Sequence, residues 1–115
     1  MDMEKLVDMA CIPYREGEPR SPASEVAQLL PQVPGWQIVE REGIERLERV
    51  FRFKDFAGAL GFANRAGALA EAENHHPAIL VEWGRTTVTW WTHKVRGLHH
   101  NDFVMAAKTD RAHTG

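Results

Sequence analysis

The sequence predicts an α+β fold: a four-stranded antiparallel sheet with helices packed on one face, a two-layer sandwich in the order α-β-β-α-β-β-α. Two observations support this fold class. Some short segments are rich in β-branched and aromatic residues, whereas others carry apolar residues at helical spacing. The strand-like segments also form two pairs with short turns between them, and a short turn makes neighbouring strands antiparallel.

The chain has 115 residues, which predicts one domain with one core. Residues 1–20 mix Pro13, Gly17 and Pro19 with charged residues. We therefore expect an extended N-terminal arm over residues 1–20 and a single domain over residues 21–115.

The first helix is expected just after the arm. Ser21 has the character of an N-cap, and Pro22 suits the first helical position. Pro31 and Pro34 are expected to end the helix after about three turns. Its apolar stripe consists of Val26, Leu29 and Leu30.

The first pair of strands is expected over residues 36–40 and 44–53, with a tight turn between them. Leu47, Phe51 and Phe53 are predicted to share one face of the second strand. The alternation is imperfect around Arg49 and Val50, which predicts a β-bulge at that point.

The second helix has the clearest end signals. Asp55 is a good N-cap, and Asn74 tolerates the left-handed conformation that ends many helices. Mostly small residues recur between them at helical spacing, so the helix is expected to lie close to the sheet. These residues are Phe56, Ala59, Leu60, Ala63, Ala66, Gly67 and Ala70.

A second hairpin and a last helix complete the predicted fold. Residues 78–83 and 86–93 have strand character and flank Gly84, which predicts a type II′ turn. The last helix is expected over residues 101–112. Asp102 would lie in its first turn, where the helix dipole favours a negative charge.

Composition excludes several classes of protein. The net charge of −2 gives no basic face for nucleic acid, and no apolar run approaches the roughly 20 residues that span a membrane. The acidic N-terminus does not resemble a secretory signal. The single cysteine, Cys11, cannot form an internal disulfide, which suits a reducing, cytoplasmic location. We expect no functional role for Cys11.

Three histidines and a carboxylate are candidates for one site. His75 and His76 follow the second helix directly, and His93 ends the last predicted strand. A hairpin places the end of its second strand beside the start of its first, so the three imidazoles are expected to be neighbours. The last helix begins a few residues later, which also allows Asp102 to approach.

Other interpretations of these residues remain open. Adjacent loop histidines are often exposed without any role, and Asp102 is explained almost fully by its place at a helix start. Three histidines can also hold a catalytic zinc with water as the fourth ligand. Adjacent histidines tend to diverge, however, and no cysteine lies near them, so we predict no metal site. A nucleophilic mechanism has no suitable serine or cysteine nearby.

The segment "EAENHHPAILVEWGRTTVTWWTHKVRGLHHNDF" resembles the core of the pterin-4a-carbinolamine dehydratases, especially bacterial members that accompany phenylalanine hydroxylase. The family pattern is an ordered set of residues, and this sequence departs from it at none of the key positions. The set is Glu71, His75, His76, Pro77, Trp83, His93, Gly97, Leu98 and Asp102. The resemblance is densest over residues 71–108, continues weakly back to Trp36 and fades in the arm.

The resemblance implies an enzyme, a hydro-lyase that dehydrates 4a-hydroxytetrahydropterin to quinonoid dihydropterin and water. An imidazole titrates near pH ~6.5 and can serve as acid or base near neutrality. His75 and His93 are expected to be the acid–base pair and His76 to bind and orient the pterin. No cofactor is expected, because loss of water transfers no electrons.

Supporting roles also follow from the resemblance. Asp102 would orient or stabilise one imidazole, and Glu71 would tune His75 from one helical turn back. Trp83 or one of the tandem tryptophans, together with Pro77, would contact the flat pterin.

The expected partners are the pterin substrate, further copies of the chain in a homodimer or homotetramer, and a phenylalanine hydroxylase pathway. The same family also suggests an alternative, a non-enzymatic binding or regulatory protein such as a transcriptional coactivator or hydroxylase regulator.

Overall fold

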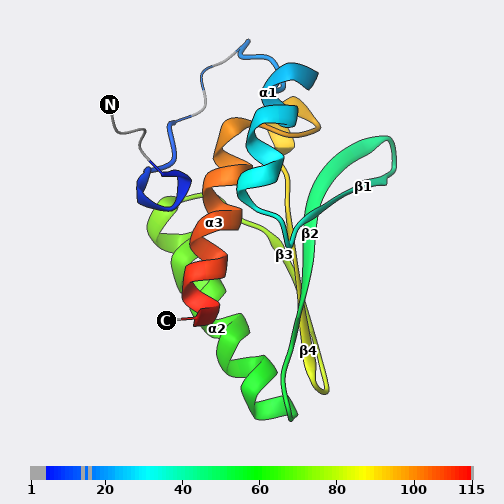
Figure 1. The fold of residues 1–115 in the computed structure, drawn as a ribbon, viewed down its shortest axis with the longest axis vertical. Coiled ribbons are helices and arrows are strands. Elements are labelled where there is room, and N and C mark those ends of the chain that lie inside the picture. Colours follow the sequence, from blue (N-terminus) through cyan, green and yellow to red (C-terminus); the bar gives the residue numbers. More distant parts are fainter. Residues whose placement is uncertain (1–4, 14, 16, 115) are drawn as a thin grey trace.

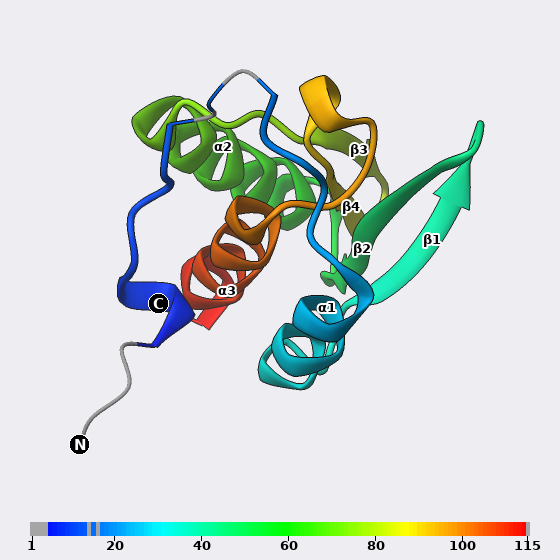
Figure 2. The ribbon, with the colours of Figure 1, turned by 90° about the horizontal axis from the view of Figure 1, so that it is seen from above.

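The computed structural model describes residues 5–13, 15 and 17–114, and it confirms the α+β fold (Figure 1). A four-stranded sheet has the strand order β1-β2-β4-β3, and every neighbouring pair is antiparallel. Helices α2 and α3 lie side by side on one face of it (Figure 2). The strands are β1 (Gln37–Arg41), β2 (Ile44–Arg52), β3 (Ala78–Glu82) and β4 (Arg85–Trp90). The helices are α1 (Ala23–Leu29), α2 (Phe56–Glu73) and α3 (His100–Thr114), with 3-10 turns at Leu6–Asp8, Leu30–Gln32 and His93–Val95.

Helix α1 begins one residue later than predicted. Pro22, not Ser21, is the N-cap, and the Ser21 hydroxyl instead donates a hydrogen bond to Glu25 at 2.5 Å. The α-helix ends at Leu29, and a 3-10 turn then contains Pro31. The helix therefore ends near the prolines as predicted, and its last turn is a tighter 3-10 turn.

The bulge predicted in β2 is absent, because the pairing between β2 and β4 runs without interruption from Leu47 to Arg52. The alternation is imperfect for a different reason. Arg49 occupies an inward position, where its guanidinium bonds Asp110 of α3 at 2.6 Å and lies 4.4 Å from the Phe51 ring. A paired charge thus replaces an apolar side chain on the covered face.

Helix α2 has both predicted ends. The Asp55 carboxylate accepts the Gly58 N–H at 2.7 Å, and Asn74 adopts the left-handed conformation with φ of 52°. The predicted stripe is wrong in part, because Phe56 and Leu60 are exposed. Phe62 is buried in their place, since its ring packs on Phe51 and Phe53 at centroid distances of 4.5 and 5.5 Å, which sets the rotation of the helix.

The second hairpin turns one residue earlier than predicted. Glu82 pairs with Arg85, so the central turn residues are Trp83 and Gly84. Gly84, the second of them, has φ of 78°, which excludes the predicted type II′ turn with glycine in the first central position.

The last strand is also shorter than predicted. Strand β4 ends at Trp90, Thr92 pairs in isolation with Gly97, and His93 begins a 3-10 turn instead of ending a strand. Arg96 closes this turn in the left-handed conformation.

The core lies between the sheet and the helices α2 and α3. Its largest fully buried side chains are Trp90, Phe51, Phe62 and Phe103. Within the described residues, no helix combines the length and the apolar character needed to cross a membrane.

Candidate active site

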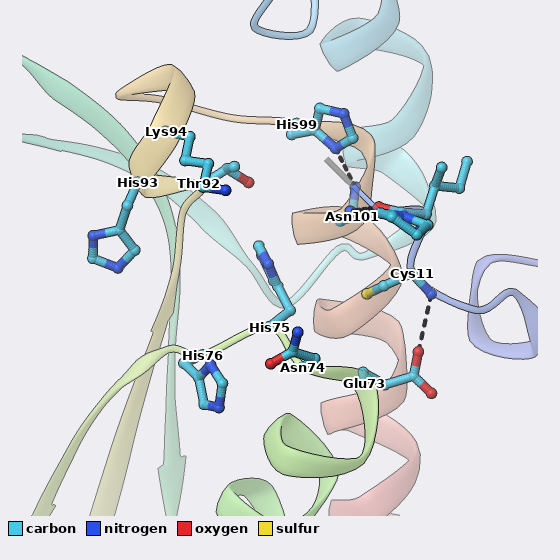
Figure 3. A pocket seen from close by; sticks show the side chains of 12 residues that line it. Cys11, Glu73, Asn74, His75, His76, Thr92, His93, Lys94, His99 and Asn101 are labelled. Carbon is cyan, nitrogen blue, oxygen red and sulfur yellow. Dashed lines mark hydrogen bonds between the residues drawn. The ribbon is translucent and has the colours of Figure 1, made fainter. Parts of the chain in front are cut away.

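A pocket of about 500 Å³ lies where the end of α2, the end of β4 and the start of α3 meet the N-terminal segment (Figure 3). His75, His76 and His93 all line it. The antiparallel β3–β4 register brings them together, because it places the residues before β3 beside those after β4. Asp102 lies beside His75 and is fully buried.

His75 is held from two sides. The left-handed Asn74 turns the chain at the end of α2, and the His75 N–H then bonds the Ala70 carbonyl at 3.1 Å. The His75 Nε2 atom lies 2.7 Å from Asp102 Oδ1, and its ring stacks on the buried Trp90 at 5.6 Å with an interplanar angle of 5°. Only 14% of the side chain is exposed, so its orientation is closely defined.

Asp102 accepts three hydrogen bonds. Besides His75, the Thr92 hydroxyl and the His99 N–H donate to its Oδ2 atom, each at 2.9 Å. A carboxylate can only accept, so the proton of this contact belongs to His75 Nε2. The basic nitrogen of His75 is then Nδ1.

His76 points away from Asp102 and bonds Glu71 Oε2 through Nε2 at 2.5 Å. Glu71 therefore contacts His76 and not His75, the imidazole that the prediction assigned to it. Consecutive side chains diverge after the left-handed residue Asn74, so His75 turns toward α3 and His76 turns back along α2. Both partners are largely exposed, with 53% of His76 and 78% of Glu71 accessible.

His93 lies across the pocket from Cys11 and Asn101 (Figure 3). Its imidazole is exposed and packs against Trp91, with 4.6 Å between ring centroids. The Arg46 guanidinium lies 4.1 Å from the Trp91 ring centre. Within the described part of the chain, no side-chain hydrogen bond holds the His93 ring, which leaves its nitrogens accessible from the pocket.

The structure does not bring Trp83 or Pro77 into the pocket lining. Trp83 is 72% exposed at the turn between β3 and β4, because the hairpin carries it to the end of the strands away from the histidines. The tryptophan that contacts a site histidine is instead Trp90, which buttresses His75 from the core.

Several pocket residues were not predicted. Thr92 and His99 bind the Asp102 carboxylate, and Cys11 and Asn101 line the wall of the pocket. The spacing of His99 and Asp102 carries a sequence signal, because a carboxylate three residues after a helix cap often accepts the cap N–H. The contacts of Cys11 have no such local signal.

The electrostatics of the pocket wall are set by burial and by neighbouring carboxylates. Burial, with Glu73 and Asp102 nearby, raises the pKa of the Cys11 thiol to about 12. Cys11 is therefore a neutral thiol near pH 7. The hydrogen bond from His99, 2.6 Å away, lowers the pKa of Glu18. Among the described residues, no group of three or more His, Cys, Asp or Glu side chains is placed to hold a metal ion.

The family model of pterin 4 alpha carbinolamine dehydratase matches residues 19–112 of this sequence. The chain belongs to this family. Its membership confirms the resemblance noted in the sequence, together with the predicted enzyme class of hydro-lyase.

Relatives of this dehydratase-family chain agree along nearly its whole length. A protein of Nitrosococcus oceani, provisionally named pterin-4-alpha-carbinolamine dehydratase, is 56% identical over 109 residues, which cover 95% of this chain and 96% of the relative. A protein of Syntrophotalea carbinolica with the same provisional name is 55% identical over 108 residues, covering 94% and 96%. A crystal structure from Brucella melitensis, described as a transcriptional coactivator/pterin dehydratase, has a TM-score of 0.73 and 38% identity over 81% of this chain and 97% of its own.

Proposed function

We propose that the pocket dehydrates 4a-hydroxytetrahydropterin to quinonoid dihydropterin by acid–base catalysis with His75 and His93. The observation that carries this proposal is the fixed, carboxylate-bound His75 in one pocket with an accessible His93. Elimination of water needs one group that accepts a proton and another that donates one, and two imidazoles suit both tasks near neutral pH.

The proposed reaction breaks the bond between C4a and its hydroxyl oxygen. The base removes the proton from the neighbouring ring nitrogen, N5, and the electron pair of that N–H bond forms the new N5–C4a double bond. The pair of the broken C–O bond leaves with the oxygen, which takes a proton from the acid and departs as water. No net electron transfer occurs.

The contacts of each histidine suggest its role. His75 is the proposed base, because the Asp102 carboxylate keeps its proton on Nε2 and stabilises the imidazolium that forms when Nδ1 takes a second proton. His93 is the proposed acid, because its exposed ring can exchange protons with solvent between turnovers. His76 is proposed to bind and orient the pterin at the pocket edge.

We propose that this reaction recycles the pterin cofactor of an aromatic amino acid hydroxylase. Phenylalanine hydroxylase is the expected pathway partner, and the cytoplasm is the expected location. The hydroxylase reaction leaves the 4a-hydroxy pterin, and its dehydration returns a pterin ready for reduction. The provisional names of the relatives support the pterin substrate.

The direct test follows the absorbance decay of freshly made 4a-hydroxytetrahydropterin with and without the protein. We expect His75→Ala and His93→Ala each to slow the catalysed decay by about 10- to 10⁴-fold, the reach of one general acid or base. His113→Ala is the matched control, because His113 packs among Phe51, Phe53 and Phe62, away from the pocket. Wild-type rates in both site variants would refute the proposal.

The same assay separates acid–base catalysis from metal catalysis. Dialysis against a strong chelator should leave the rate unchanged, and the rate should vary with pH through inflections near neutrality. Activity that is lost on chelation and restored by zinc would contradict the mechanism.

A binding or regulatory role is the second candidate, and the coactivator named in the description of the Brucella melitensis structure is the observation that favours it. A binding role alone does not require the bonded pair of His75 and Asp102. Absence of any rate enhancement by the wild-type protein would favour this second role.

A further inference from the structure

The N-terminal segment forms one side of the histidine pocket. Cys11, Ile12 and Pro13 line it together with the residues at the ends of α2 and β4. In Figure 3, Cys11 and Asn101 lie on one side, His93 lies on the other, and His75 lies between them. This segment precedes residues 19–112, the part of the chain that matches the family model.

Asn101 holds this segment in a defined position. Its side-chain Oδ1 accepts the Ile12 N–H at 2.8 Å, and its Nδ2 donates to the Ile12 carbonyl at 2.7 Å. Asn101 is only 5% exposed, so a nearly buried amide satisfies both backbone groups of one residue. A second bond runs from the Cys11 N–H to Glu73 Oε1 at 2.9 Å.

The anchors of the segment lie next to His75 and Asp102, the two residues of the bonded imidazole–carboxylate pair. Glu73 ends α2 two residues before His75, and Asn101 directly precedes Asp102 in α3. The placement of Cys11, Ile12 and Pro13 is thus tied to the same helix ends that orient the imidazole.

The wall that these residues offer is apolar. The Ile12 backbone groups are already bonded to Asn101, Pro13 has no N–H, and the Cys11 thiol is neutral because burial raises its pKa. Ile12 is 52% exposed and is one of the residues that line the pocket. The side chains of this wall offer no strong hydrogen-bond partner to the amide and amino groups at the pyrimidine end of a pterin, which require such partners.

We propose that Ile12 determines substrate specificity by packing against the substituent next to the reacting nitrogen of the pterin, and that Asn101 is the positioning residue that fixes Ile12. The polar end of the ring then lies toward the other side of the pocket, where Thr92 and Lys94 supply polar side chains near His93 (Figure 3). This inference rests on the proposed dehydration of a 4a-hydroxypterin.

The test compares two 4a-hydroxytetrahydropterins, one with a 6-methyl group and one with a three-carbon 6-substituent. Ile12→Trp places a larger side chain at this wall and narrows the pocket. We expect it to raise KM for the larger substrate by about 10-fold or more, and KM for the 6-methyl substrate by less than about 3-fold. We expect kcat to stay unchanged for both substrates. Asn101→Leu keeps a side chain of similar volume but removes both hydrogen bonds to Ile12. We expect it to reduce the ratio of kcat/KM between the two substrates by about 3- to 10-fold.

The matched control is Asp8→Asn, which removes an exposed ion pair with Arg111 elsewhere on the same segment and should leave both KM values unchanged. An equal rise in KM for both substrates in Ile12→Trp, or no rise at all, would overturn the inference. If Asn101→Leu fails to fold, the half-exposed Ile12 variant decides alone. A wild-type protein without activity toward either pterin would instead overturn the proposed function.

Discussion

His75 has its ring plane set by Trp90 and its tautomer set by Asp102. Both constraints act on the same imidazole from the protein interior. They leave one ring nitrogen as a base and give the imidazolium a carboxylate partner when it forms. His76, its neighbour in the sequence, has neither constraint and bonds the exposed Glu71. Adjacent histidines therefore differ in chemistry because their side chains diverge.

Replacement of Asp102 by asparagine is expected to slow dehydration by on the order of 10- to 100-fold, because an amide can no longer stabilise the His75 imidazolium. The variant should also change the pH dependence of kcat, which a purely structural defect would not do. Steady-state assays from pH 5 to 9 measure both effects.

Asp110→Asn is the matched control for this prediction, since Asp110 lies on the same helix but bonds Trp36 and Arg49. It should lower the stability and leave the shape of the pH profile unchanged. The same pH profile for Asp102→Asn as for wild type would contradict the role of Asp102.

The Cys11 thiol should react slowly with iodoacetamide. Its pKa rises from 9.0 to about 12 through burial and the nearby Glu73, so at pH 8 its thiolate fraction falls by roughly 10³-fold. Because the folded pKa exceeds the unfolded one, the associated stabilisation is complete below pH 9 and is lost as the pH rises toward 12. Mass spectrometry of native and urea-unfolded protein measures the two alkylation rates, and equal rates would disprove the shift.

Helix α2 leads from the sheet to the histidine pocket, and its two ends are defined by different side chains. Asp55 satisfies the Gly58 N–H at the start, and Asn74 turns the chain at the end so that His75 enters the pocket. The small buried residues Ala59, Ala63 and Ala66 let the helix lie close to the sheet.

Asp55→Ala is expected to lower the free energy of unfolding by about 1 kcal/mol, because it leaves a helix N–H without its cap. Urea denaturation measures this change. Lys54→Ala, at the exposed residue before the cap, should stay within about 0.5 kcal/mol of wild type. Equal stability of the two variants would show that the cap contributes nothing.

Among the described elements, the helices cover a single face of the sheet (Figure 2). On the other face, Val50 and Leu80 are 41% and 57% exposed, and β1 and β3 form the open edges of the sheet. Exposed edges and apolar surface are usually paired or covered in stable proteins. A symmetric self-association through an edge or this face would cover both.

We therefore expect a homodimer or homotetramer, with a mass in light scattering at micromolar concentration of at least twice the 13.0 kDa of one chain. Leu80→Lys should shift the population toward monomer if β3 or the open face forms the contact, because it places a charge in an apolar interface. This variant leaves His75, His76 and His93 in place, so its activity reports whether association affects the pocket. A monomeric wild-type protein would contradict the prediction.

Much of this organisation follows from local pattern. Local sequence predicts both ends of α2, at Asp55 and Asn74, and the presence of two hairpins. Each of these features depends on residues that lie close together in the chain. The meeting of His75 and His93 was also predictable, because antiparallel pairing of the β3–β4 hairpin leaves little freedom in where its ends meet.

Contacts between residues far apart in the sequence account for the features that the local sequence pattern did not predict. The inward Arg49 depends on Asp110, 61 positions away in the sequence. The N-terminal wall of the pocket depends on the bond of Cys11 to Glu73, 62 positions away, and on the bonds of Ile12 to Asn101, 89 positions away. Spacing could not show which adjacent histidine faces Asp102, because that follows from the left-handed turn at Asn74 and from the buried Trp90 surface. Local propensity thus defines the elements, whereas burial and charge pairing between distant segments decide which side chains share the pocket.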